Sequence, residues 1–218
     1  SSPVQKQTTQ ALILDRHKVN NDIIVNTVTA EQGRLSAVAR HARNAKKRFR
    51  GHLETLTLVE ITYRHRPDWD LARLDDVRAI HTFPIIKGDL LRLSMATVMA
   101  EIILAFTRDG LVELELYYLT LKAFKSLDTP ERRVDESFLV LFELRALMLA
   151  GFLPPLEQVF GDDDPATTQC KEWLAGTWRP MEQSLAQRAS TRLERIIQEQ
   201  IGRPLKSRGL LDEALGWE

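Results

Sequence analysis

The chain has 218 residues, of which 44% are hydrophobic, so it is long enough to bury one large core or two small ones and is not a disordered polymer. Its formal net charge is zero, but residues 1–80 hold 14 Lys or Arg against 9 Asp or Glu, and residues 81–218 hold 16 against 21. The single cysteine, Cys170, excludes an internal disulfide and an all-cysteine metal site. The charge imbalance indicates that the first part of the chain meets a polyanion.

Between residues 11 and 83 the apolar side chains alternate or form short β-branched runs, which is typical of strands. Gly33 lies where the link between the second and third strands needs a positive φ, and HRPDWD (65–70) has the Pro and Asp of another turn. Five antiparallel strands are predicted, at 11–16, 22–29, 34–42, 52–64 and 71–80. They suit an OB-type barrel, although another five-stranded barrel would leave much the same pattern.

From Pro84 the period becomes helical, and the apolar residues at 91, 95, 98, 102 and 106 predict a helix with one apolar stripe. Further helices are predicted at about 112–127, 131–150, 168–176, 181–201 and 207–215. The longest apolar-rich stretch, residues 90–106, contains Arg92 and Glu101 and is shorter than the ~20 residues that cross a bilayer, so no membrane association is expected.

The predicted fold class is therefore α+β and multi-domain, with a five-stranded OB-type barrel followed by an all-helical domain. A flexible segment is expected at 1–10, the OB domain at 11–83 and the helical domain at 84–218. Within the helical domain, GDDDPATT (161–168) is acidic and rich in turn formers, and it is predicted to be a mobile loop.

One segment concentrates positive charge. RHARNAKKRFRG (40–51) has six Lys or Arg in twelve residues, and no acid occurs between Gln32 and Leu53. A solvated loop or a nuclear-localisation signal would have the same composition. The position between two barrel strands and the missing acids favour contact with a polyanion, because the like charges otherwise repel one another. The cations of this region are Arg34, Arg40, Arg43, Lys46, Lys47, Arg48 and Arg50.

Few aromatic side chains accompany these cations. Phe49 lies inside the segment, and Tyr63 and Trp69 follow it. Contact with the phosphate backbone is therefore expected more than readout of bases.

Several stretches resemble the RecO family of bacterial DNA repair and recombination mediators. These are the Thr29, Glu31, Gly33 pattern before a strand, AVARHAR followed by RFRGHLETL, LFELRALMLAGFLPPLE (141–157) and GRPLKSRGLL (202–211). They follow one another in the family's order along nearly the whole chain.

The resemblance implies an OB domain and a helical domain with no catalytic centre and no cofactor. It implies binding to single- and double-stranded DNA, annealing of complementary strands, and help for RecA in replacing the single-stranded-DNA-binding protein. The implied partners are RecR and the acidic C-terminal tail of the single-stranded-DNA-binding protein, and the implied location is the bacterial cytoplasm, at the nucleoid. The seven cations listed above become the DNA-binding edge of the barrel.

The chain also departs from the family pattern. Many members carry a four-cysteine zinc module after the segment matching GFLPPLE, whereas this chain continues QVFGDDDPATTQC, so no structural zinc is predicted. His41 stands where the family commonly has glycine, which bears on the geometry of the local turn.

Two later motifs add candidates. In FELR, Glu143 and Arg145 are expected to project from a helix, and by resemblance Arg145 is the candidate contact for the acidic tail. In PLKSR, Ser207 is predicted to cap the last helix, while Lys206 and Arg208 are candidate DNA contacts. Docking of these two cations onto the rest of the protein is the favoured alternative.

No other function class has comparable support. His65, Asp68, Asp70 and His81 lack the spacing of metal ligands, and no nucleophile, phosphate-loop or dinucleotide motif occurs. A metal-dependent nuclease is therefore disfavoured. The open alternative is a non-catalytic adaptor whose helical domain binds a protein and whose basic loop is only a solvated surface.

Overall fold

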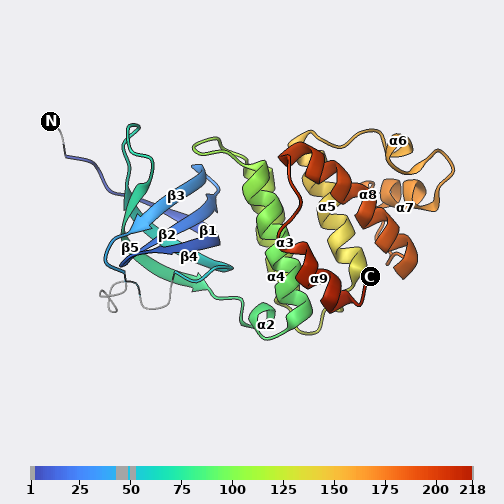
Figure 1. The fold of residues 1–218 in the computed structure, drawn as a ribbon, viewed down its shortest axis with the longest axis horizontal. Coiled ribbons are helices and arrows are strands. Elements are labelled where there is room, and N and C mark those ends of the chain that lie inside the picture. Colours follow the sequence, from blue (N-terminus) through green and yellow to red (C-terminus); the bar gives the residue numbers. More distant parts are fainter. Residues whose placement is uncertain (1–2, 43–48, 50–52, 218) are drawn as a thin grey trace. The chain divides into compact units, whose positions relative to one another are not determined.

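The computed structural model describes residues 3–42, 49 and 53–217 (Figure 1). The chain divides into two compact units. The barrel unit comprises residues 1–84 and 107–121, and the helical unit comprises residues 85–106 and 122–218. Residues 107–121 therefore belong with the barrel, although the sequence places them in the helical domain.

The barrel unit contains a closed five-stranded barrel with the strand order β1-β2-β3-β5-β4, and β4 pairs again with β1. Its strands are β1 (Gln7–Val19), β2 (Asp22–Thr29), β3 (Gly33–Ala39), β4 (Thr57–Arg64) and β5 (Ala72–His81). The predicted OB-type barrel is confirmed. Its interior is filled by alternate residues of every strand, including Val25, Ala37 and Ile61, all at 0% exposure.

One predicted feature of the sheet is wrong. The strands were expected to be antiparallel throughout, but β3 and β5 are parallel and pair Ala37 with Ala72 and Val38 with Arg73. The reason is geometric, because directions cannot alternate around a closed ring with an odd number of strands. One of the five contacts must therefore be parallel.

The ends of the strands also differ from the prediction. β1 begins at Gln7, inside the segment expected to be flexible, and residues 7–10 pair with 60–63 of β4. The outward side chains of this stretch are polar and exposed, so the apolar pattern does not reveal it. β3 ends at Ala39 and β4 begins only at Thr57, which leaves a longer connection than predicted.

Gly33 opens β3 with a φ of 66°, as its position in the sequence predicts. A Cβ atom at this residue would overlap the carbonyl oxygen of Leu111, in the returning segment of the barrel unit. Two independent constraints, the left-handed backbone and the close approach, therefore require glycine here.

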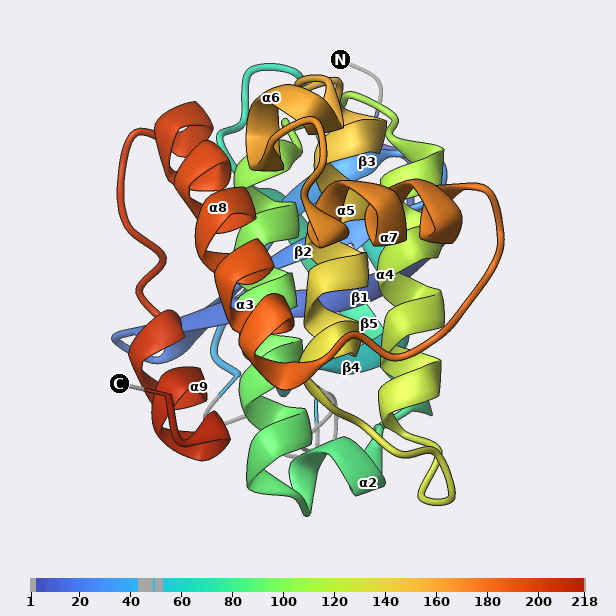
Figure 2. The same ribbon diagram turned by 90° about the vertical axis from the view of Figure 1, so that its right-hand side faces the viewer.

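The remaining elements are helices. They are α2 (Pro84–Lys87), α3 (Leu90–Phe106), α4 (Leu114–Leu127), α5 (Glu136–Ala150), α6 (Leu156–Phe160), α7 (Pro165–Leu174), α8 (Gln183–Ile201) and α9 (Arg208–Leu215). In the helical unit α5 packs between α3 and α8, and α9 packs on α3 (Figures 1 and 2). The single apolar stripe predicted for α3 is wrong, because residues on most of its sides are buried, Ser94, Ala96 and Met99 among them.

The acidic segment 161–168 is not a loop throughout. Asp164 caps α7 by accepting a hydrogen bond from the backbone N–H of Ala166 at 2.8 Å, and Pro165 takes the first helical position. Arg188 of α8 donates two hydrogen bonds to the same carboxylate. Residues 165–168 therefore form the first turn of a helix that is held against α8.

No helix in the described part of the chain is long and apolar enough to cross a membrane.

Candidate nucleic-acid interface

The basic segment is anchored to the barrel at both ends and once between them. Ala42, Phe49 and Leu53 belong to the buried core of the barrel, at 9%, 3% and 3% exposure. Arg16 of β1 donates a hydrogen bond to the carbonyl of Leu53 at 3.4 Å. The predicted contacts Arg43, Lys46, Lys47, Arg48 and Arg50 lie outside the described residues.

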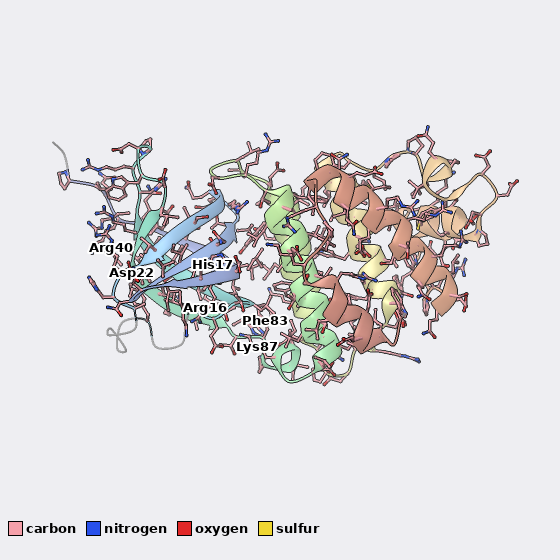
Figure 3. The ribbon with its side chains drawn as sticks, viewed as in Figure 1. Arg16, His17, Asp22, Arg40, Phe83 and Lys87 are labelled. Atoms are coloured by element: carbon pink, nitrogen blue, oxygen red, sulfur yellow. The ribbon has the colours of Figure 1, made fainter. Side chains whose placement is uncertain are left out.

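The segment leaves the barrel beside the β1–β2 hairpin. Val19 pairs with Asp22 across the hairpin, and Ile23 pairs with both Lys18 and Ala39. Lys18 and Arg40 are both exposed at this end, and Figure 3 shows Arg40 close to Asp22. One further cation, Lys18 of β1, therefore lies beside the point at which the basic segment begins.

His41 has a φ of 58°, in the left-handed region that glycine adopts without strain. Its backbone N–H donates to Asp22 Oδ1 at 2.8 Å, which fixes the turn. A residue other than glycine is strained in this conformation, and the hydrogen bond to Asp22 stabilises the turn with His41 in place. The left-handed backbone also sets the direction in which the chain leaves β3.

Arg34 does not join this group. It is the second residue of β3, whereas Arg40 follows the end of the strand, so about six residues, or ~20 Å, separate the two backbones. The Nε of Arg34 lies 3.8 Å from the Asp109 carboxylate, and its carbonyl accepts a hydrogen bond from the N–H of Gly110. The continuous basic edge that the sequence predicts is thus interrupted by the length of one strand.

The aromatic side chains differ from the prediction. Phe49 is a core residue, and Tyr63 is 2% exposed, with its hydroxyl bonded to Gln7 Oε1 at 3.1 Å. Burial raises the pKa of the Tyr63 phenol. Of the three candidates, Trp69 alone keeps an exposed surface within the described part of the chain.

Lys206 and Arg208 of the helical unit have different surroundings. Lys206 is exposed, while the Arg208 side chain is 11% exposed and lies 3.1 Å from Glu194 and 2.8 Å from Asp212. Its guanidinium also lies over the Trp217 ring, 5.1 Å from the centroid. These contacts fit the alternative in which Arg208 docks α9 onto the rest of the helical unit and does not contact DNA.

Ser207 occupies the predicted N-cap position of α9, but its side chain makes no capping bond and donates instead to Glu101 Oε1 at 2.7 Å. Glu101 of α3 also accepts the backbone N–H groups of Lys206 and Ser207 and pairs with Arg203. These hydrogen bonds hold the Glu101 pKa below its usual range although burial opposes them. The PLKSR motif is therefore a docking motif for the C-terminal helix.

Glu143 does not project from α5 as predicted but is completely buried. Its Oε1 accepts a hydrogen bond from Ser190 at 2.8 Å, and Oε2 has no partner among the described residues. Burial raises the Glu143 pKa to about 8, helped by Glu194 and opposed by Arg208.

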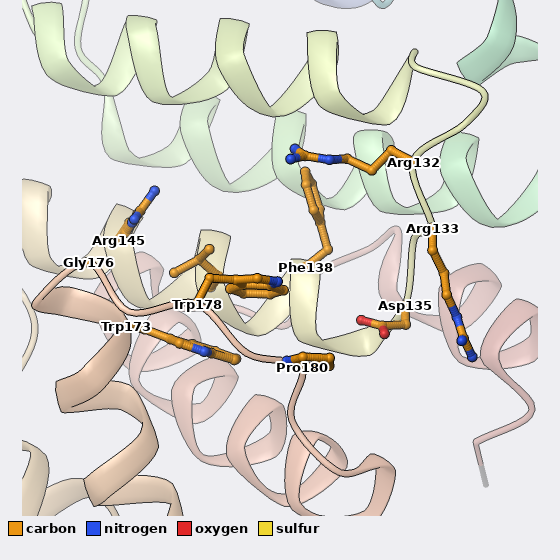
Figure 4. A pocket seen from close by; sticks show the side chains of 10 residues that line it. Arg132, Arg133, Asp135, Phe138, Arg145, Trp173, Gly176, Trp178 and Pro180 are labelled. Carbon is orange, nitrogen blue, oxygen red and sulfur yellow. The ribbon is translucent and has the colours of Figure 1, made fainter.

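Arg145 lines a pocket of about 390 Å³ in the helical unit (Figure 4). Phe138 and Leu141 form part of its wall. Trp173 is buried and stacks on the exposed Trp178, with ring centroids 5.1 Å apart and planes at 22°. The pocket therefore combines a broad apolar and aromatic surface with a cation.

Sequence reasoning missed the two other cations of this pocket, Arg132 and Arg133. Both lie in the connection before α5, and Arg132 is held by a 2.8 Å bond from its Nη1 to Ser126 Oγ. The one carboxylate in the lining, Asp135, accepts the N–H of Ser137 as the cap of α5. Three guanidinium groups thus face a pocket whose only acid is already engaged.

No group of three or more potential metal ligands is formed by the described residues. Cys170 is buried, and burial together with Asp164 raises the pKa of its thiol to about 12.

A closed OB-type barrel followed by a separate helical unit defines a two-part OB-fold protein, here with cations around the exit of its third strand. Residues 4–83 match the family model described as Recombination protein O N terminal, and residues 87–161 match Recombination protein O C terminal. The two models follow each other along most of the chain. The chain belongs to the RecO family.

Similar proteins share the name DNA repair protein RecO. The one from Anaeromyxobacter sp. (strain K) is 38% identical over 137 residues, which cover 63% of this chain and 53% of the relative. The one from Desulfatibacillum aliphaticivorans is 33% identical over 154 residues, covering 69% and 59%. The one from Syntrophobacter fumaroxidans is 29% identical over 150 residues, covering 68% and 58%. The chain thus matches little more than half the length of these relatives.

Proposed function

We propose that this chain is a non-catalytic mediator of DNA repair and recombination in the bacterial cytoplasm. It binds single- and double-stranded DNA, anneals complementary strands and helps RecA to load onto DNA covered by the single-stranded-DNA-binding protein, with RecR as a further partner. The observation that carries the proposal is the acid-free basic segment, which begins at the exposed Arg40, is anchored through Phe49 and has Lys18 beside it at the hairpin end of an OB barrel.

Annealing requires that two phosphate backbones approach each other. Lys and Arg side chains lower the repulsion between the strands by replacing condensed counterions, and no bond is made or broken. The six cations between residues 40 and 50 would give a log-log salt slope of roughly −4 for a single strand. Binding should therefore weaken steeply with salt and depend little on sequence.

The test reverses three charges of the segment and compares them with three exposed charges of the helical unit. The test variant is Lys46→Glu, Lys47→Glu, Arg48→Glu, and the control is Lys122→Glu, Lys125→Glu, Arg195→Glu. Both variants have the same net charge. The test variant should lose annealing of complementary oligonucleotides and about half of the salt slope, whereas the control should keep both. Equal annealing by the two variants would contradict the proposal.

The adaptor alternative makes the opposite prediction, because a solvated loop contributes nothing to function. It is favoured by unchanged partner binding in the test variant together with flat or absent DNA binding at low salt. A steep salt dependence of DNA binding in the unaltered protein excludes it.

We further propose that the pocket around Arg145 receives the acidic, apolar-ended tail of the single-stranded-DNA-binding protein. Arg132, Arg133 and Arg145 offer bidentate donors to carboxylates, and Trp178 and Phe138 offer an apolar surface to the end of the peptide. Neither Arg133 nor Arg145 forms an ion pair within the described part of the chain, so their charges are free for a ligand.

This site is tested with a fluorescent peptide that ends in acidic residues followed by an apolar one. Arg145→Ala and Trp178→Ala should each lower affinity about tenfold, the usual effect of removing a central Arg or Trp contact. Arg195→Ala, which removes an exposed cation elsewhere on the unit, should not. Equal affinity of all three variants would refute the assignment.

A further inference from the structure

Where the connection between β4 and β5 enters β5, two arginines lie against one aromatic ring. The Cζ atom of Arg73 lies 4.1 Å from the centroid of the Trp69 ring, and that of Arg66 lies 5.6 Å from it. A backbone bond from Trp69 N to Arg66 O, 3.0 Å long, closes the turn that brings them together. Neither arginine forms an ion pair within the described part of the chain, although Asp68 and Asp70 are neighbours in sequence.

A cavity of about 590 Å³ adjoins this stack. Four segments of the barrel unit contribute to it: Gln7 of β1, the end of β4 with the turn after it (63–70), residues 32–36 around the start of β3, and the returning residues Asp109 and Gly110. Its polar lining offers both donors and acceptors, from Gln7, Gln32, Arg34, Ser36, His65, Asp70 and Asp109. The volume lies in the range of small-molecule sites.

The side chains of the lining favour a neutral, planar ligand over an anion. Asp109 is paired with Arg34, but Asp70 would repel a phosphate inside the cavity, whereas a neutral, flat, heteroaromatic group can stack on the indole and guanidinium planes. Its edge can exchange hydrogen bonds with amides, hydroxyls and carboxylates at once. A nucleobase has this combination of a stacking face and mixed donor and acceptor edges.

The Trp69–Arg73 stack beside the cavity also lies close to the proposed path of the DNA phosphates. Arg73 pairs with Val38 across the parallel β3–β5 contact, and Arg40 follows Val38 by two residues. The backbones of Arg73 and Arg40 are therefore only about 8 Å apart, from strand spacing and rise. A strand that passes Arg40 and Arg73 through its phosphates has a base within reach of the cavity.

We infer that the cavity beside Trp69 accepts one unstacked nucleobase of a single strand, while Arg66 and Arg73 contact the flanking phosphates. This inference rests on the proposed DNA binding and adds a base-binding site to it. Single-stranded DNA would then be favoured over duplex, since a paired base is not free to enter. The site explains why Trp69 is only half-buried while Phe49 and Tyr63 are buried.

The experiment compares a fluorescent oligonucleotide with one of equal length and charge that lacks bases. The unaltered protein should bind the abasic strand about tenfold more weakly, as the loss of one stacked base predicts. Trp69→Ala should bind the normal strand more weakly by the same factor and should no longer distinguish the two strands. Its salt slope should stay unchanged, because no phosphate contact is removed, and Trp69→Phe should recover most of the affinity.

The possible outcomes distinguish failure of the nucleobase site from failure of the proposed DNA binding. Salt-dependent binding in which the unaltered protein does not distinguish the two strands overturns the nucleobase site and leaves the proposed DNA binding in place. Absence of binding to either strand at low salt overturns both. The comparison of strands on the unaltered protein does not depend on how Trp69→Ala folds, and thermal unfolding of that variant shows whether its own result can be used.

Discussion

Replacing Glu143 by glutamine is expected to remove a pH dependence from the stability of the helical unit. Glu143 is fully buried on α5, and Ser190 of α8 donates a hydrogen bond to one of its oxygens. The cation whose charge acts on Glu143, Arg208, is already bound by Glu194 and Asp212. The Glu143 carboxyl is therefore neutral when folded at neutral pH, with a pKa of about 8.

The direction of the pH effect on stability follows from the number of protons that the folded and the unfolded state bind. The unfolded chain releases the Glu143 proton near 4.5, whereas the folded chain keeps it up to about 8. Stability is therefore lost as pH rises through this window. Between about pH 6 and pH 9 the loss is about 3 kcal/mol, since each pH unit over which only the folded state is protonated contributes about 1.4 kcal/mol. Glutamine has the same shape and no charge, so this part of the loss should disappear, and only the smaller contribution of Glu194, whose pKa is also raised by burial, should remain.

The assay uses Cys170, which lies in the same unit and is 0% exposed. Its thiol reacts with an alkylating reagent only after the helical unit opens, so the labelling rate relative to unfolded protein at the same pH gives the free energy of opening. Unfolding of the barrel unit is not recorded. Glu199→Gln, which alters an exposed carboxylate on α8, is the matched control and should behave as the unaltered protein does.

Two results would refute the reasoning. If Glu143→Gln keeps the same fall in stability between pH 6 and pH 9, another group is responsible. If Glu143→Gln is destabilised by about 3 kcal/mol or more already at pH 6, Glu143 is a charged partner of Arg208 rather than a neutral carboxyl, because removing one member of a buried ion pair has that cost.

Two further substitutions test the fold. Gly33→Ala should lower the midpoint of thermal unfolding severely, because the new methyl group meets the Leu111 carbonyl, whereas Gly110→Ala has a similar φ and open space and should cost only about 1 kcal/mol. Asp164→Ala should cost about 1–2 kcal/mol in urea unfolding followed by Cys170 labelling, since α7 loses its cap and Arg188 loses its carboxylate, and no change would show that neither contact stabilises the unit.

The sequence specifies the barrel through local signals. Alternation of apolar residues identifies the strands, and Gly33 marks a turn that the backbone confirms. The parallel β3–β5 contact is not encoded in any single strand, because it follows from closing a ring of five. The start of β1 escapes detection since Gln7, Thr8 and Gln10 are exposed and only Thr9 is buried among them.

The candidate sites divide in the same way. The basic segment is visible because its charges are contiguous, but the pocket assembles Arg132, Arg145 and Trp178 from three separate stretches of chain. Glu143 was misplaced for a related reason. A carboxylate on an amphipathic helix is expected to face solvent, and its hydrogen-bond partner, Ser190, is 47 residues away in sequence.

Whether a cation pairs within the protein or remains available to a ligand depends on the acidic residues near it, as a comparison of PLKSR with residues 40–50 shows. Arg208 has Glu194 and Asp212 within ion-pair distance, and so its charge stabilises the docking of α9. Lys206, two residues earlier, is exposed and contributes only its backbone N–H to Glu101. Between Gln32 and Leu53 no acid occurs, and so the repulsion among those cations has no relief within the segment. A polyanion would supply that relief, and this is the physical reason for proposing that DNA binds to the barrel and not to the last helix.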